Sequence, residues 1–174
     1  ELLKEDFGYG SDTALHPVPA YCFEDQLLQT GCGTNEFIAD GEYSVTAKVN
    51  YLFGGAWYPV ADHTPATTPV KNQGRFLVVN VKAETTYPIL YEKTINSIIP
   101  NEDLKIELYA ANLFSSNFSA TAPDLKIALE DNFGNEISSF NTGAIAKNQS
   151  WNFINGILKP GANISVRFVI RSFE

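Results

Sequence analysis

Apolar and polar residues alternate in short runs along most of this chain, and a two-residue period is typical of strands with one buried face. In the clearest run, Leu104, Ile106 and Leu108 share one side. Nowhere in the sequence do apolar residues recur at helical spacing over three turns. The pattern predicts an opening strand over residues 1–10 and further strands over residues 41–50, 75–81, 89–95, 104–112, 125–129, 137–140, 151–158 and 164–171.

Turns rich in proline, glycine and asparagine separate these runs at intervals of about ten residues. The best hairpin signal is a turn with Asp131, Asn132, Gly134 and Asn135 between two short strands. Strands without intervening helices favour an antiparallel β-sandwich, and within that class we expect a jelly roll. The whole chain, residues 1–174, is expected to form one such domain, excised from a longer surface protein.

The charge of the chain limits its partners. It has 12 Lys and Arg against 20 Asp and Glu, a formal charge of -8. Nucleic acid and anionic membranes would repel such a chain, whereas cations and neutral sugars would not. No apolar run approaches the roughly 20 residues of a membrane helix, so we expect no membrane insertion.

Two cysteines, Cys22 and Cys32, lie in a loop rich in Gly, Thr and Gln. Neither would be buried there as a packed thiol, so we predict a disulfide between them and an oxidising compartment. A pair of reduced surface thiols is the alternative. A zinc site is not expected, because only His16 and His63 could add to the ligands.

The residues needed for catalysis are not grouped in the sequence. The strand carboxylates are scattered singly, whereas a glycosidase needs two facing each other. His63 follows Asp62, but no Ser or Cys is placed to act with them as a nucleophile. We therefore expect no enzyme. The scattered carboxylates are Glu42, Glu92, Glu107 and Glu130.

Acidic residues at three predicted strand ends make a better case for a bound cation. Hard cations such as calcium take several oxygen ligands, and loops at the rim of a sandwich supply them. The alternative is that each acidic residue is a polar strand end that faces water, or, for Asp62, that it caps a turn. The three groups are Glu5 with Asp6, Asp40 with Glu42, and Asp62.

Sugar binding would use exposed aromatic rings with polar groups beside them. Trp57, Tyr58, Trp151 and Phe153 are the candidates. The alternative is that the tryptophans belong to the core, as they commonly do in β-sandwiches.

An ordered set of motifs spans nearly the whole chain. It resembles the jelly-roll domains of large secreted surface proteins of Bacteroidetes, commonly adhesins or gliding-motility-associated proteins exported by the type IX system. It is also similar to MAM-type and carbohydrate-binding jelly rolls. The motifs are Asp6-Phe7-Gly8 with Gly10, Tyr21-Cys22 with Cys32, residues 40–43 (DGEY), Trp57, residues 62–64 (DHT), residues 74–80, Tyr91, an Ile-Pro-Asn turn, residues 109–113, residues 141–145 and Trp151.

The resemblance implies roles for several of these residues. In the similar jelly rolls, acidic residues of the opening strand and of the DHT loop help to hold a structural cation. Asp6 and Asp62 would then be calcium ligands, with Glu5 and Glu42 behind them. Thr13 lies in an Asp-Thr-Ala sequence that fits the O-glycosylation motif of Bacteroidetes surface proteins. One departure is that such domains continue with a further Asp-containing strand, which could supply another ligand.

The sequence thus predicts a non-catalytic adhesion or glycan-binding module of a secreted bacterial cell-surface protein, with a structural calcium at its rim. Its partners would be a surface glycan or a host or substratum polymer, and other domains of the same chain. A purely structural spacer in a surface fibre is the alternative. A glycoside hydrolase accessory domain is a third interpretation.

Overall fold

The structure is a computed structural model, and it describes residues 2–5, 7, 21–23, 38, 40–50, 52–63, 74–81 and 88–172. Strands and loops make up this part of the chain, and its one helical element is the short 3-10 turn η1 (Phe53–Gly55). The predicted all-β class with antiparallel sheets is confirmed. One described pair departs from it, because β1 (Cys22–Phe23) runs parallel to β2 (Glu42–Thr46).

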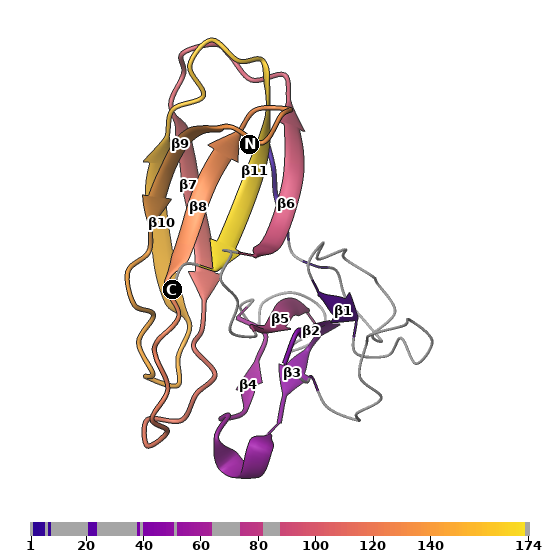
Figure 1. The fold of residues 1–174 in the computed structure, drawn as a ribbon, viewed down its shortest axis with the longest axis vertical. Coiled ribbons are helices and arrows are strands. Elements are labelled where there is room, and N and C mark those ends of the chain that lie inside the picture. The colour runs from indigo at the N-terminus through magenta and orange to yellow at the C-terminus, as the bar shows by residue number, and fades with distance from the viewer. Residues whose placement is uncertain are drawn as a thin grey trace.

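The larger sheet comes from the second half of the chain and has four antiparallel strands in the order β6-β11-β8-β9 (Figure 1). Alternate side chains of these strands point to one face, where Ile127, Leu129 and Val166 are fully buried. The strands are β6 (Ile89–Asn96), β8 (Leu125–Glu130), β9 (Glu136–Asn141) and β11 (Ser165–Ser172).

A smaller sheet of two antiparallel strands, β7 (Leu104–Ala110) and β10 (Asn152–Leu158), stacks on the apolar face of the larger one (Figure 1). This arrangement is consistent with the predicted β-sandwich, and we refer to β6 to β11 as the two-layer body. Its core consists of eight buried side chains: Tyr91, Ile95, Ile98, Ile127, Leu129, Leu158, Val166 and Phe168.

The two layers approach most closely where β10 contacts β9. A Cβ atom on Gly156 would lie 2.5 Å from Cε1 of Phe140, so only glycine fits at this place without a shift of the ring. Glycine therefore lets the small sheet lie tightly against this edge of the large one.

The outer face of the four-stranded sheet is covered by ion pairs. Glu130 is buried between Arg167 and Arg171, and its Oε1 lies 2.7 Å from Nη2 of Arg171. Arg167 also reaches Oε2 of Glu92 on β6 at 3.3 Å. The register places Arg167 beside Glu130, so the strand pairing itself aligns these charges.

The strands from the first half of the chain form two smaller sheets beside the body. One has the order β1-β2-β5, and the other pairs β3 with β4. Leu77 of β5 packs against the core of the two-layer body and also against the cluster around Tyr21, Tyr43 and Leu90. It therefore joins these sheets to the body. The remaining strands are β3 (Lys48–Val49), β4 (Val60–Ala61) and β5 (Phe76–Asn80).

The strand predicted over residues 41–50 differs from expectation in two ways. It is interrupted at Ala47 and forms the separate strands β2 and β3, which belong to different sheets. It is also not half-buried, because Glu42, Tyr43, Ser44 and Val45 are all buried. Tyr43 packs in a cluster with Tyr21 and Leu90, and β2 pairs with a strand on each side.

The ends of two other predicted strands also differ. Residues 2–5 and 7 are not in a strand; the backbone N–H of Phe7 donates to Glu5 and Phe7 has φ of 52°, which gives a local turn. Ile164 is exposed and precedes β11, where its carbonyl accepts from the N–H of Ile98. A local turn at Glu5 and Phe7 therefore replaces the expected opening strand, whereas the hydrogen bond between Ile98 and Ile164 lies just beyond the end of the β6-β11 ladder.

Candidate functional site

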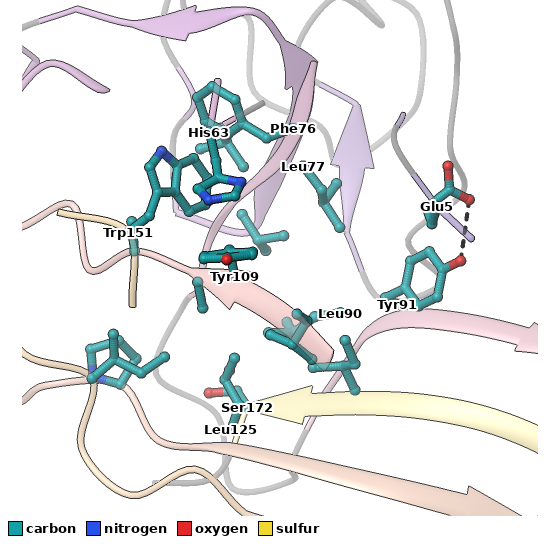
Figure 2. Close-up of a pocket in the computed structure, with 18 of the residues that line it drawn as sticks. Glu5, His63, Phe76, Leu77, Leu90, Tyr91, Tyr109, Leu125, Trp151 and Ser172 are labelled. Carbon is teal, nitrogen blue, oxygen red and sulfur yellow. Dashed lines mark hydrogen bonds between the residues drawn. The ribbon is translucent and has the colours of Figure 1, made fainter. Parts of the chain in front are cut away.

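A cavity of about 940 Å³ lies where β5 and β7 meet the inner face of β6 and β11. Its floor includes Tyr91, Phe168 and Ile170, and its walls include Leu77 and Leu108. Figure 2 shows part of this lining, with apolar side chains in the middle and polar groups toward the two ends. Its size and apolar lining are those of a ligand pocket.

At one end of the cavity stands a row of aromatic rings. The imidazole of His63 stacks on the ring of Tyr109, with centroids 3.4 Å apart and planes at 25° (Figure 2). Trp151 meets His63 edge to face at 6.1 Å, and its indole N–H donates to the carbonyl of Ala61 at 2.9 Å. The ring of Phe153 lies next to that of Tyr109, with the two ring centroids 5.2 Å apart.

The row ends on the outer face of the β7-β10 sheet. Tyr109 and Phe153 are opposite each other in the register, and they are 45% and 50% exposed. The next pair on the same face is Glu107 with Asn155, and Lys105 follows, its Nζ 2.6 Å from Oε1 of Glu107. Two exposed rings thus adjoin a carboxylate, an amide and an ammonium group.

At the other end of the cavity, Glu5 contacts Tyr91. The Tyr91 hydroxyl donates to Oε2 of Glu5 at 3.2 Å (Figure 2). Burial, and then the charge of Glu5, raise the pKa of Tyr91 well above its usual value. The hydroxyl therefore stays protonated and the carboxylate stays its acceptor.

The structure does not bring the described members of the predicted cation site into a metal-binding group. Glu5 already accepts from the N–H of Phe7 and from the hydroxyl of Tyr91. Glu42 is buried in β2, whereas Asp62 follows β4 at the cavity wall. Among the residues described, no three His, Cys, Asp or Glu side chains are grouped to hold a metal ion. Asp6 lies outside the described residues.

The predicted sugar-binding rings have different positions. Trp57 and Tyr58 are only 5% and 3% exposed and belong to the core, although Trp57 also contributes to the cavity lining. Trp151 is partly buried against the cluster that contains Trp57 and Phe76, and it lines the cavity. Only Phe153, the fourth candidate, is well exposed.

Two other predictions fall largely outside the described residues. Cys22 begins β1, but Cys32 is outside, and the predicted disulfide is therefore not tested. Thr13, the predicted glycosylation site, is also outside.

The contribution of Tyr109 was not recognised as part of a site from the sequence. The alternation that places Leu104, Ile106 and Leu108 on one side predicts the outward side for Tyr109, and Phe153 is one of the candidate rings. What brings them together is the pairing of β7 with β10, more than forty residues away along the chain. The only signal in the sequence for this site was an aromatic residue at an outward position in each of the two strands, Tyr109 and Phe153.

Comparison of the chain with protein-family models, with curated proteins and with solved structures gives no match. Within its described part, no helix is both long and apolar enough to cross a bilayer.

Proposed function

We propose that this chain is a non-catalytic, glycan-binding adhesion module of a secreted bacterial cell-surface protein. The observation that carries the proposal is the exposed pair Tyr109 and Phe153 on the outer face of β7 and β10. Aromatic rings offer apolar faces to the C–H groups of a sugar, and neighbouring polar groups bind its hydroxyls. Asn155, Glu107 and Lys105 supply both donors and acceptors beside the rings.

A neutral polysaccharide fits this face better than an acidic one. The chain has a formal charge of -8, which would repel an anionic polymer. Lys105 is paired with Glu107, so this face of the β7-β10 sheet carries little net charge. We therefore expect hydrogen bonds and ring contacts, with little dependence on salt.

The strand order supports a jelly roll as the finer description of the two-layer body. In that body the first strand, β6, pairs with the last, β11, and β11 pairs with the third, β8. The second strand, β7, pairs with the fifth, β10. Such nested pairing of early with late strands is what two interlocked Greek keys produce.

The cell-surface setting, the Cys22 to Cys32 disulfide and the calcium ion remain proposals. The resemblance supports the setting, the loop composition around the two cysteines supports the disulfide, and the acidic residues at predicted strand ends support the ion. The described carboxylates do not form a site for calcium. Melting the chain with calcium and with EDTA tests the ion, because a ligand that binds the native state raises the melting temperature. An unchanged melting temperature would remove calcium from the proposal.

Glycan binding is tested by screening the intact chain on an array of neutral plant, bacterial and host glycans. Phe153→Ala should weaken binding to any positive glycan by about tenfold, the value of one lost ring contact. Ile157→Ala is the matched control, since Ile157 is an exposed apolar residue on the same face of β10. Equal loss in both variants would argue against an aromatic site.

A structural spacer that binds no ligand is the alternative to glycan binding. The chain enters β6 and leaves β11 at the same end of the four-stranded sheet, since Ile89 pairs with Arg171 (Figure 1). Silence on a broad array, combined with normal folding, would favour the spacer.

A further inference from the structure

Two strands each have one edge without a partner strand among the described residues. In the sheet β1-β2-β5, strand β5 lies at the edge, and in the small sheet β7 pairs with β10 alone. In each strand, every second residue directs its N–H and C=O groups toward that edge. Open edges of this kind are sites at which a further strand can add.

Both edges line the same cavity. Residues 75–81 and residues 103–114 all contribute to its surface, including inward and outward side chains alike. A wall made of consecutive residues means that the backbone edge of each strand, and not one of its faces, borders the space. The cavity therefore has hydrogen-bonding walls and an apolar floor.

The inward side chains of β7 are less buried than the inward side chains of β8. Leu104, Ile106 and Leu108 pack against the core of the two-layer body but remain partly exposed. On β8, Ile127 and Leu129 hold equivalent inward positions and are fully buried. An apolar side chain in the cavity would cover the exposed parts of the β7 side chains and stabilise the complex.

We propose that the cavity accepts an extended segment of another polypeptide as an added strand between β5 and β7. Its backbone would pair with the two edges, and its alternate apolar side chains would lie on Tyr91, Phe168 and Ile170. This strand would join the sheet of β5 to the sheet of β7 and enlarge the smaller layer of the body. The site shares Tyr109, Glu107 and Lys105 with the proposed glycan site, because all three line the cavity, whereas Phe153 and Asn155 do not line it.

Charge indicates which segment would bind. The whole chain has a formal charge of -8, and acidic groups also prevail around the cavity. A segment with apolar residues at alternate positions and lysine or arginine at its ends is complementary to that surface. The charged residues of the lining are Glu5, Asp62, Asp103 and Glu107 against Arg75 and Lys105.

Hydrogen exchange of the intact chain tests the proposal, with a synthetic heptapeptide that alternates valine and threonine and has lysine at both ends. Binding should slow amide exchange in β5 and β7 and leave the β8-β9 hairpin unchanged. The same peptide with an N-methyl group on every residue cannot donate a backbone hydrogen bond to either edge, and it should have no effect. Amides of β5 and β7 that are already as protected as those of β8 in the chain alone would overturn the proposal, since their edges would then be paired within the chain.

A cavity-filling variant provides the second test. Ile106→Trp places a large ring in the cavity and should weaken peptide binding by more than about tenfold. Ile157→Trp is the control, because Ile157 is exposed on the opposite face of the small sheet and should leave binding unchanged. Equal affinity of the two folded variants would overturn the site.

The mass of the chain in solution distinguishes a second copy from a different partner. Light scattering should find a monomer at concentrations where the peptide binds. A dimer that the peptide dissociates would mean that the occupant is a second copy, which would overturn the choice of partner. Phe153→Ala should retain peptide binding, so failure of the glycan proposal and failure of this one can be told apart.

Discussion

The two layers of the body differ in how completely their residues are used for stability. The four-stranded sheet contains the fully buried inner side chains Ile127, Leu129 and Val166, and its outer face carries ion pairs around Glu130. In the two-stranded sheet, the inward side chains Leu104, Ile106 and Leu108 are partly exposed. The aromatic rings of Tyr109 and Phe153 are exposed on its outer face. The four-stranded sheet therefore acts mainly as a scaffold, and the two-stranded sheet has exposed apolar surface at which a ligand could bind.

The largest expected difference between the layers comes from shortening one leucine in each. Leu129→Ala on β8 should lower the free energy of unfolding by about 3 kcal/mol, because it leaves a cavity in a fully packed region. Leu108→Ala on β7 should cost only about 1 kcal/mol, since part of that side chain is already exposed. Urea unfolding of both variants measures this, and equal costs would contradict the comparison.

Removing charge from the outer faces should give the next largest contrast. Glu130→Gln leaves Arg167 and Arg171 without their shared carboxylate, and it should cost about 2 kcal/mol after allowance for their partial exposure. Glu107→Gln removes the exposed pair with Lys105 on the other layer and should cost less than about 0.5 kcal/mol. Unfolding in low and high salt measures both, and a larger loss at Glu107 would reverse our assignment.

The contact between the layers can be tested at Gly156. Gly156→Ala forces its new methyl group against Phe140 and should cost about 1 kcal/mol. Adding Phe140→Leu removes the ring that obstructs this methyl group. The double variant should therefore lose less stability than the sum of the two single variants. Additive losses would show that the layers do not touch at this place.

The smallest effect concerns the β8-β9 hairpin of the scaffold layer. Asp131 accepts hydrogen bonds from the side chain and backbone of Asn135 and from the N–H of Phe133, which lowers its pKa below the usual 3.8. A lowered pKa stabilises the folded state above the unfolded pKa, and this stabilisation is lost as the pH falls through the folded pKa. Asp131→Ala should thus lower the melting temperature at pH 7, and the difference from the unchanged chain should shrink below pH 4. A difference that persists at pH 2 would rule out this linkage.

The strands of the two-layer body were predictable, because the alternation of apolar residues in β6 to β11 is a local property of the chain. The turn with Asp131 and Asn135 was equally local, and it is formed as expected. Which strands would pair was not accessible from the sequence. Nor could the sequence show which faces other segments would cover, and β2 is buried on both.

The candidate site was harder to predict than the fold for the same reason. Trp57 is a large aromatic residue in a polar loop sequence, yet its bridges to Leu52 and Phe114 draw it into the core. Tyr109 and Phe153 have ordinary sequence surroundings and become a site only through their register. An aromatic ring can bind a ligand only if other residues leave it exposed. Segments that are distant in the sequence determine which rings are covered.

Tyr109 borders the cavity with one side and contacts Phe153 with the other. A strand added between β5 and β7 would therefore contact a ring that also belongs to the proposed glycan site. Sugar affinity and strand addition would become thermodynamically linked, each altering the other by the same factor.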